Sequence, residues 1–400
     1  MSKVFIAAAK RTAVGSFNGS LADVPAPVFA AEVVRDILQS TGFPAADLDE
    51  VIVGNILPAG IGQGPGRQVA LGAGVPIEVP AYSLNIACGS AMKAVMNAAT
   101  AIRAGLGHAY MAGGMENMSI APYLIPGARQ GLRMGDKTII DHMVADALTD
   151  AFHHYHMGIT AENVADQCGI TREAQDEFAI ASQQKAIAAV DAGRFKNEIT
   201  PVTVKVRKDE VVFDTDEYPN RKTDLAKLST LRSAFKKDGT VTAGNASGIN
   251  DGAAFMLVVS EEALAKYNLT PLAELVAFGQ GGVDPSVMGL GPVPAIRNAL
   301  AMGGLKLADI DLIELNEAFA AQSLGVVKEL SAEHGISEAD ILARTNVNGG
   351  AIALGHPVGA SGVRIAVTLL HLMLAQEAEY GLASLCIGGG MGTAIILRRV

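Results

Sequence analysis

Short apolar runs alternate with longer amphipathic stretches over most of the 400-residue chain. The runs have the length of buried strands, whereas the stretches show the three-to-four-residue apolar spacing of helices. This alternation predicts an α/β fold in which helices cover a parallel or mixed sheet. The predicted strands are 4–9, 50–54, 81–86, 108–113, 254–259, 272–279, 312–315, 344–347, 384–387 and 393–398. The predicted helices are 27–41, 90–104, 172–192, 261–266, 295–302 and 362–376, with Thr171 and Ser260 as N-caps.

A weak internal repeat divides the pattern into two similar halves. The run VIVGN at 51–55 resembles LIELN at 312–316, and YMAGGM at 110–115 resembles LCIGGGM at 385–391. Between the halves, residues 119–250 break the rhythm, because they carry more charge and a long predicted helix. We interpret this segment as an insertion that covers the core and contributes to substrate recognition.

Composition excludes several classes of protein. The net charge of −10 argues against a general nucleic-acid binder, which would present a basic face. Three cysteines without a C-x-x-C pair predict no disulfide framework and no zinc site, and they favour a reducing, cytoplasmic location. The apolar run 4–9 is too short for a signal sequence or a membrane span, so no membrane association is expected.

Cys88 lies between the predicted strand 81–86 and a helical pattern that begins at Ser90. At a helix N-terminus the dipole and the free N–H groups favour a thiolate, so we expect a lowered thiol pKa and a nucleophile. The alternative is a small buried hydrophobic residue, which describes most free cysteines. The turn alone leaves both interpretations open.

Three further segments hold candidate chemistry. His356, between Gly355 and Pro357, is held by the chain and suits a general base, although a structural loop histidine has the same pattern. Cys386 ends a strand at a Gly-Gly-Gly turn whose N–H groups could form an oxyanion hole, or it is a buried strand cysteine. Asn316, after another strand, either holds a water or caps a helix. Cys168 is interpreted as structural. The Gly388-x-Gly390-x-Gly392 pattern is no dinucleotide fingerprint, because a strand follows it.

The chain as a whole resembles the thiolase family. The matching segments occur in the family's order: NIACGS at 85–90, GGMENMS at 113–119, NEAFA at 316–320, NGGAIALGHP at 348–357 and CIGGGMG at 386–392. The resemblance implies a five-layer αβαβα fold with two similar halves and an inserted loop domain. It assigns 1–119 and 251–270 to the N-terminal half, 120–250 to the loop domain and 271–400 to the C-terminal half.

The resemblance also implies a reaction and roles within it. It is strongest to the short-chain members, which join two acetyl-CoA into acetoacetyl-CoA and free CoA by a ping-pong path; a broader 3-ketoacyl-CoA thiolase is the alternative. Cys88 would carry the acyl group, and His356 would activate Cys88 and then the CoA thiol. Cys386 would exchange the α-proton, and Asn316 would hold a water that, with His356, binds the enolate oxygen. The N–H groups of Cys88 and Gly388 would bind the second oxyanion.

The remaining implications concern binding. CoA is a substrate, and neither a cofactor nor a metal is expected. The expected CoA and acyl contacts are Arg221, Ser247, Ala243, Leu148, His156, Met157, Phe235, Met288 and Phe319, whose bulk suits short chains. The family is usually dimeric or tetrameric, so we expect a dimer of dimers with residues 123–143 as a contact.

Departures from the family pattern are Ala91, Ser233 and the glycine-rich loop 60–67, none of which removes a catalytic group. Three rival hypotheses fit less well. A condensing enzyme acting on acyl-carrier substrates would pair its cysteine with two histidines, and an NAD-dependent oxidoreductase would need a dinucleotide fingerprint. A non-enzymatic binding protein would have lost at least one catalytic group.

Overall fold

A single mixed sheet path runs through the protein, seen in a computed structural model that describes residues 2–206 and 208–400. Its strand order is β13-β14-β15-β12-β1-β11-β5-β3-β4. The strands are β1 (Val4–Thr12), β3 (Glu50–Gly54), β4 (Ala81–Leu84), β5 (Ala109–Asn117), β11 (Asn250–Ser260), β12 (Ala273–Gly282), β13 (Leu312–Leu315), β14 (Tyr380–Ile387) and β15 (Met391–Arg399). Short strands β2 (Gly15–Ser16) and β8 (Ile199–Thr200) pair at the side of this path.

The two halves of the path repeat one topology. In the N-terminal half, β4, β3 and β5 are parallel neighbours, and β5 then pairs antiparallel with β11, which pairs with β1. In the C-terminal half, β13 and β14 are parallel, and β14, β15 and β12 are antiparallel neighbours in the same order. A short β1–β12 pairing joins the halves at Phe5–Glu274 and Ile6–Ala273. The internal repeat predicted from the sequence is therefore confirmed.

The predicted strand 344–347 is wrong, although it lies where the repeat requires a counterpart of β4. Only Thr345 bridges to β13, through Ile313. The next residue, Asn346, has a φ of +47°, which interrupts extended backbone. Its side chain replaces the missing strand: Oδ1 accepts from the Leu315 N–H at 2.9 Å and Nδ2 donates to the Leu315 carbonyl at 2.7 Å.

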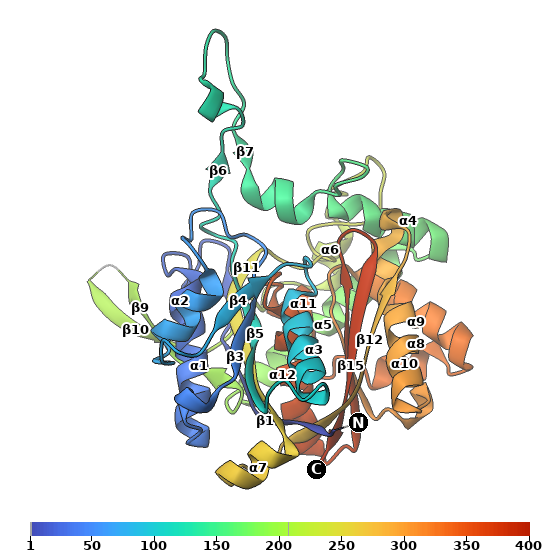
Figure 1. Cartoon of the computed structure of the whole chain (residues 1–400). Coiled ribbons are helices and arrows are strands. Elements are labelled where there is room, and N and C mark those ends of the chain that lie inside the picture. The colour runs from blue at the N-terminus through green and yellow to red at the C-terminus, as the bar shows by residue number, and fades with distance from the viewer. Residues whose placement is uncertain (1, 207) are drawn as a thin grey trace.

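Helices and sheet halves form five layers (Figure 1). Helices α1 (Ala26–Thr41) and α2 (Pro65–Gly72) pack on the outer face of the N-terminal half. The central layer holds α3 (Ser90–Arg103) and α12 (Ser361–Gln376), which share one apolar cluster with both halves of the sheet. Helices α8 (Pro292–Gly303) and α9 (Ala320–His334) cover the outer face of the C-terminal half. This arrangement confirms the predicted five-layer fold.

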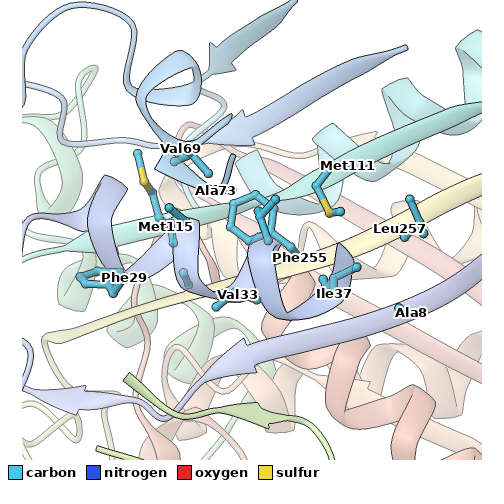
Figure 2. Close-up of a cluster of buried hydrophobic side chains, with 14 of the residues drawn as sticks. Ala8, Phe29, Val33, Ile37, Val69, Ala73, Met111, Met115, Phe255 and Leu257 are labelled. Carbon is cyan, nitrogen blue, oxygen red and sulfur yellow. The ribbon is translucent and has the colours of Figure 1, made fainter. Parts of the chain in front are cut away.

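The outer N-terminal layer shows how the apolar spacing builds the core (Figure 2). Phe29, Val33 and Ile37 recur at helical spacing along α1 and face strand residues such as Met111 and Phe255. All five side chains are fully buried. Helix α2, in contrast, begins inside the glycine-rich segment 60–67, of which the sequence predicted only a loop.

Between β5 and β11 the chain forms most of the smaller elements. They are β6 (Tyr123–Leu124), β7 (Ile140–Asp141), the π-helix Val144–Leu148, α4 (Met157–Cys168), α5 (Arg172–Asp191), β9 (Val202–Val206), β10 (Asp209–Phe213) and α6 (Leu225–Ser229). Strands β6 and β7 form the base of an arm that projects from the body (Figure 1). Elsewhere lie α7 (Glu261–Tyr267), α10 (Glu338–Ala343) and α11 (Ala351–Leu354). Thr171 and Ser260 cap α5 and α7 as predicted. Along 2–206 and 208–400, no helix combines the length and apolar character needed to cross a bilayer.

Candidate active site

Cys88 lies in a tight turn between β4 and α3. Ala87 has a φ of +49°, a left-handed conformation that is uncommon for a residue with a side chain. Ser90 fixes the turn, because its Oγ accepts from the Ile86 N–H at 3.0 Å and donates to the Ala87 carbonyl at 2.6 Å. Helix α3 begins at Ser90, so the thiol lies just before a helix N-terminus, as predicted.

The expected lowering of the Cys88 pKa is wrong. Burial raises the pKa of this thiol to about 11, and the Glu116 carboxylate adds to the effect. The backbone N–H groups of Gly388 and of Cys88 itself act in the opposite direction, but they are outweighed. Desolvation of the thiolate therefore dominates over the helix terminus, and a base must remove the proton at neutral pH.

His356 lines the same cavity as Cys88, and its position and protonation state suit such a base. The Asn250 side chain fixes its backbone, because Oδ1 accepts from the His356 N–H at 2.9 Å. Nδ1 lies 2.6 Å from Ser361 Oγ, whose hydroxyl donates to the Pro357 carbonyl at 2.9 Å. Because that hydroxyl has one proton, the imidazole donates Nδ1–H to Ser361 and keeps a free lone pair on Nε2. Burial, with the charge of Arg364, lowers the pKa of His356 to about 3, so the ring is neutral.

Asn316 lies against the same imidazole. It directly follows β13 and is fully buried, with Nδ2 3.5 Å from His356 Nδ1. Its Oδ1 has no hydrogen-bond partner among the side chains and backbone that the structure describes. A buried amide oxygen needs a donor, so this position suits a bound water.

Cys386 is the last residue but one of β14 and is almost fully buried. Burial raises the pKa of its thiol, and the neighbouring Cys88 raises it further. Gly389 and Gly390, with φ of +88° and +84°, then turn the chain into β15. A side chain at Gly390 would also meet the Val283 carbonyl at 2.3 Å, so this turn requires glycine.

One cavity of about 360 Å³ brings these groups together. Cys88, His356, Cys386 and Gly388 line it, while Asn316 lies behind His356. The expected acyl and pantetheine contacts all line it as well: Leu148, His156, Met157, Phe235, Ala243, Ser247, Met288 and Phe319. The gathered groups comprise a nucleophile, a neutral base, a second thiol and inward N–H groups, which is a set suited to acyl transfer.

Aromatic rings close the acyl side of the cavity. His156 stacks on Phe235 with ring centroids 4.5 Å apart, and Phe235 meets Phe319 edge to face at 6.2 Å. Gly158 makes the stack possible, because a side chain there would lie 2.2 Å from the Phe235 ring. His156 Nδ1 accepts from the Gly158 N–H at 3.0 Å, and burial lowers the pKa of His156. These three rings line the same cavity as Cys88.

Arg221 is not brought into this cavity. Its guanidinium pairs with Asp191, at 2.5 and 3.0 Å, on the surface. It lines a neighbouring hollow of about 520 Å³ that shares Tyr218 and Ala243 with the catalytic cavity. The two spaces are therefore adjacent, as an extended ligand would require.

Sequence reasoning missed several lining residues. Tyr218 packs against Gly248, where a side chain would lie 2.3 Å from the tyrosine ring. Other missed lining residues are Met118, Ala147, Ala234, Ala246, Gly248, Ile249, Ala318 and Val358. Several lie inside motifs that the sequence had singled out, so their proximity to Cys88 was the missing information. Within 2–206 and 208–400, no cluster of three or more His, Cys, Asp or Glu side chains is arranged to hold a metal.

Comparisons with known proteins find matches over almost the whole chain. The family model "Thiolase, N-terminal domain" matches residues 4–262, and "Thiolase, C-terminal domain" matches 269–399. An acetyl-CoA acetyltransferase of Pseudomonas aeruginosa is 56% identical over 400 residues, which cover 100% of both chains. The solved acetyl-CoA acetyltransferase of Syntrophomonas wolfei superposes with a TM-score of 0.97 at 40% identity, covering 100% of both chains. Human mitochondrial 3-ketoacyl-CoA thiolase, solved in complex with CoA, gives 0.93 at 41%, covering 100% of this chain and 98% of that one.

Proposed function

The chain belongs to the thiolase family, and from this premise we propose that it is an acetyl-CoA acetyltransferase. It condenses two acetyl-CoA molecules reversibly into acetoacetyl-CoA and CoA through an acetyl group on Cys88. The observation that carries the proposal is the single cavity that holds both thiols, the neutral imidazole and Gly388. Acetyl-CoA and CoA are accordingly its ligands.

In the first half-reaction His356 Nε2 takes the proton of Cys88, and Sγ attacks the carbonyl carbon of acetyl-CoA. The N–H groups of Cys88 and Gly388, which already face the sulfur, bind the oxygen as it becomes negative. The bond to the CoA sulfur then breaks, and that sulfur takes the proton from His356. The products are acetyl-Cys88 and free CoA, and the imidazole is neutral again.

In the second half-reaction the proton of Cys386 passes to His356, and the Cys386 thiolate removes an α-proton from the next acetyl-CoA. Burial raises the pKa of this thiol, so its thiolate is a strong base for a weak carbon acid. The protonated Nε2 and the water at Asn316 bind the enolate oxygen. The enolate attacks acetyl-Cys88, and the released Cys88 sulfur takes the proton of His356. Cleavage of acetoacetyl-CoA follows the same steps in reverse.

Acetyl-CoA labelling followed by peptide mass spectrometry tests this function. Cys88 should carry the acetyl group, and Cys88→Ala should carry none. Cys386→Ala should keep the label but form no acetoacetyl-CoA. Folded protein without a label on Cys88 would exclude the mechanism.

A broader 3-ketoacyl-CoA thiolase is the second candidate, since a structural relative has that name. The ring stack of His156, Phe235 and Phe319 limits the acyl space and favours the short-chain function. Thiolysis rates with 3-ketoacyl-CoA substrates of increasing length decide between the two. A rate that rises beyond four carbons would favour the broader function.

We also propose a homotetramer in which the arm 123–143 makes the contact between dimers. Its exposed apolar side chains support this: Tyr123, Ile125, Leu132, Met134, Ile139 and Ile140. Light scattering should give four chains, and two after the arm is shortened. No cofactor is proposed, so activity should survive dialysis against a chelator. A cytoplasmic location stays a prediction from the few, unpaired cysteines.

A further inference from the structure

The segment GGMENMS has no role in the mechanism above, yet it ends at the catalytic cavity. Its Glu116 lies near the end of β5 and is fully buried. Oε1 accepts from Asn55 Nδ2 at 2.8 Å and from the Leu57 N–H at 3.1 Å, while Oε2 accepts from the Ile56 N–H at 2.9 Å. The backbone of Gly359 also approaches this carboxylate: a side chain there would lie 2.3 Å from Oε2, and its N–H acts to lower the Glu116 pKa.

These contacts come from two different loops. Residues 55–57 follow β3 and support the Cys88 turn: the Asn55 N–H donates to the Leu84 carbonyl, and Asn85 Nδ2 donates to the Ile56 carbonyl. Ile56 and Leu57 also pack against Cys88 in one apolar cluster. Gly359, in contrast, belongs to the turn that carries His356. Glu116 therefore connects residues 55–57, which support the Cys88 turn, with the turn that carries His356.

Close backbone approaches show how tightly the two turns meet at β5. A side chain at Gly114 would lie 2.2 Å from the Gly359 carbonyl and 2.7 Å from Ala91 in the first turn of α3. A side chain at Gly54 would lie 2.5 Å from the Ala91 nitrogen, and one at Gly359 would lie 2.3 Å from Glu116 Oε2. Small displacements here would move Cys88 relative to His356.

We propose that Glu116 is a positioning residue. Its one buried carboxylate accepts hydrogen bonds from residues 55–57, which support the Cys88 turn, and lies against Gly359 of the His356 turn, so it fixes one turn relative to the other. This inference rests on the proposed function, since alignment matters only if the two residues act together. The donor set requires a carboxylate. A glutamine of the same length would turn an NH₂ group toward donors and leave at least one N–H unpaired.

The carboxylate also acts on Cys88 through its charge. Among the described residues, the titratable groups that line the cavity with Cys88 or act on its thiol are Glu116 on β5, His156 before α4, Tyr218, His356 before α12 and Cys386 on β14. Burial raises the pKa of Glu116 itself to about 7, and the like charge of Asp251 on β11 adds to this, so Glu116 carries its full charge only above neutral pH. Because Glu116 raises the pKa of the Cys88 thiol, its neutralisation should shift thiol ionisation to lower pH. A substitution that only destabilised the fold would not produce that shift.

The test compares Glu116→Gln with Asp49→Asn. Asp49 is an exposed carboxylate that accepts from the His108 and Ala109 N–H groups at the opposite end of β5, so it is a matched control away from the site. Each variant is assayed by rapid-quench acetylation of Cys88 with acetyl-CoA, and by iodoacetamide alkylation of Cys88 across pH. We expect Glu116→Gln to acetylate at least tenfold more slowly, and its alkylation profile to move to lower pH. Asp49→Asn should stay within twofold of wild type in both assays.

Two different results test the proposed function and the role of Glu116. Acetylation of Cys88 in the wild-type protein tests the proposed function alone. Unchanged acetylation in folded Glu116→Gln, or slower acetylation without the pH shift, would overturn the positioning role. If Glu116→Gln does not fold, Asn55→Ala is tested in its place, because it removes only one of the donors to Glu116. Acetylation of Cys88 that is a few-fold slower would support the positioning role. Acetylation at the wild-type rate would refute it.

Discussion

Cys88 should rest as a neutral thiol beside a neutral imidazole, and this state can be measured. The pKa of Cys88 is about 11 and that of His356 about 3. Because these two pKa values differ so much, moving the proton from the thiol to the imidazole costs about 11 kcal/mol. Two opposite charges held as close as about 4 Å attract each other by about 4 kcal/mol at an effective dielectric of about 20, which sets the scale of what the ion pair could return. About 7 kcal/mol remains, so the ion pair is populated about once in 10⁵ molecules.

The test compares wild type with His356→Asn. The rate at which iodoacetamide alkylates Cys88 is measured between pH 6 and 10, and peptide mass spectrometry identifies the alkylated cysteine. We expect the wild-type rate to rise about tenfold per pH unit with no plateau near neutrality. His356→Asn should leave this profile almost unchanged, because His356 does not hold the resting thiolate. Its acetylation rate should nevertheless fall by about 10²- to 10⁴-fold through loss of the general base.

Cys168 serves as the internal control, because it is buried away from the cavity and should label slowly unless the chain opens. A wild-type plateau at pH 6–7 that disappears in His356→Asn would refute the reasoning. It would mean that the resting state is a thiolate–imidazolium pair, and that burial does not control the Cys88 proton.

Three further predictions concern the cavity walls and the base. Phe235→Ala should make room for longer acyl chains. The ratio of kcat/KM for longer 3-ketoacyl-CoA to kcat/KM for acetoacetyl-CoA should rise about fourfold per added methylene, because burying each methylene contributes about 0.8 kcal/mol. An unchanged ratio would show that Phe235 does not line the acyl space. Ser361→Ala should lower kcat by about 10- to 100-fold, because the buried Nδ1–H of His356 loses its hydrogen-bond acceptor, which costs about 1–3 kcal/mol. Ser361→Thr keeps a hydroxyl and should retain more of the rate. The folded-state pKa of His356 lies below the ordinary value of 6.5, so its contribution to stability is present above 6.5 and is lost as pH falls. Between pH 7 and 5, wild type should therefore lose about 2 kcal/mol more unfolding free energy than His356→Asn in urea titrations; parallel losses would contradict the lowered pKa.

Local pattern was sufficient for much of the fold and for the catalytic turns. Apolar spacing places α1, α3 and α12, and the strand-to-helix change places Cys88 before α3, because both depend on neighbours within one or two turns. The repeat of VIVGN and LIELN predicted two similar halves, and the sheet order bears this out. The motifs around Cys88, His356 and Cys386 were likewise visible in the printed sequence.

Long-range packing decided the rest. The segment 344–347 has the composition of a strand, but the Asn346 side chain takes the hydrogen bonds that a strand would make with Leu315. Glu116 has no sequence signal for its partners, since the loops that it joins are about 60 and 240 residues away along the chain. Arg221 follows its motif, yet Asp191 holds it outside the catalytic cavity.

By itself the sequence determined which groups could do acyl chemistry: two thiols and an imidazole in glycine turns, each beside a recognisable element. The tertiary structure alone decided their protonation. A helix N-terminus acts over one turn and would lower the Cys88 pKa, whereas desolvation depends on every segment that excludes water from the cavity. Here the second effect outweighs the first, so Cys88 is a neutral thiol beside a neutral imidazole, and the proposed mechanism has His356 take its proton.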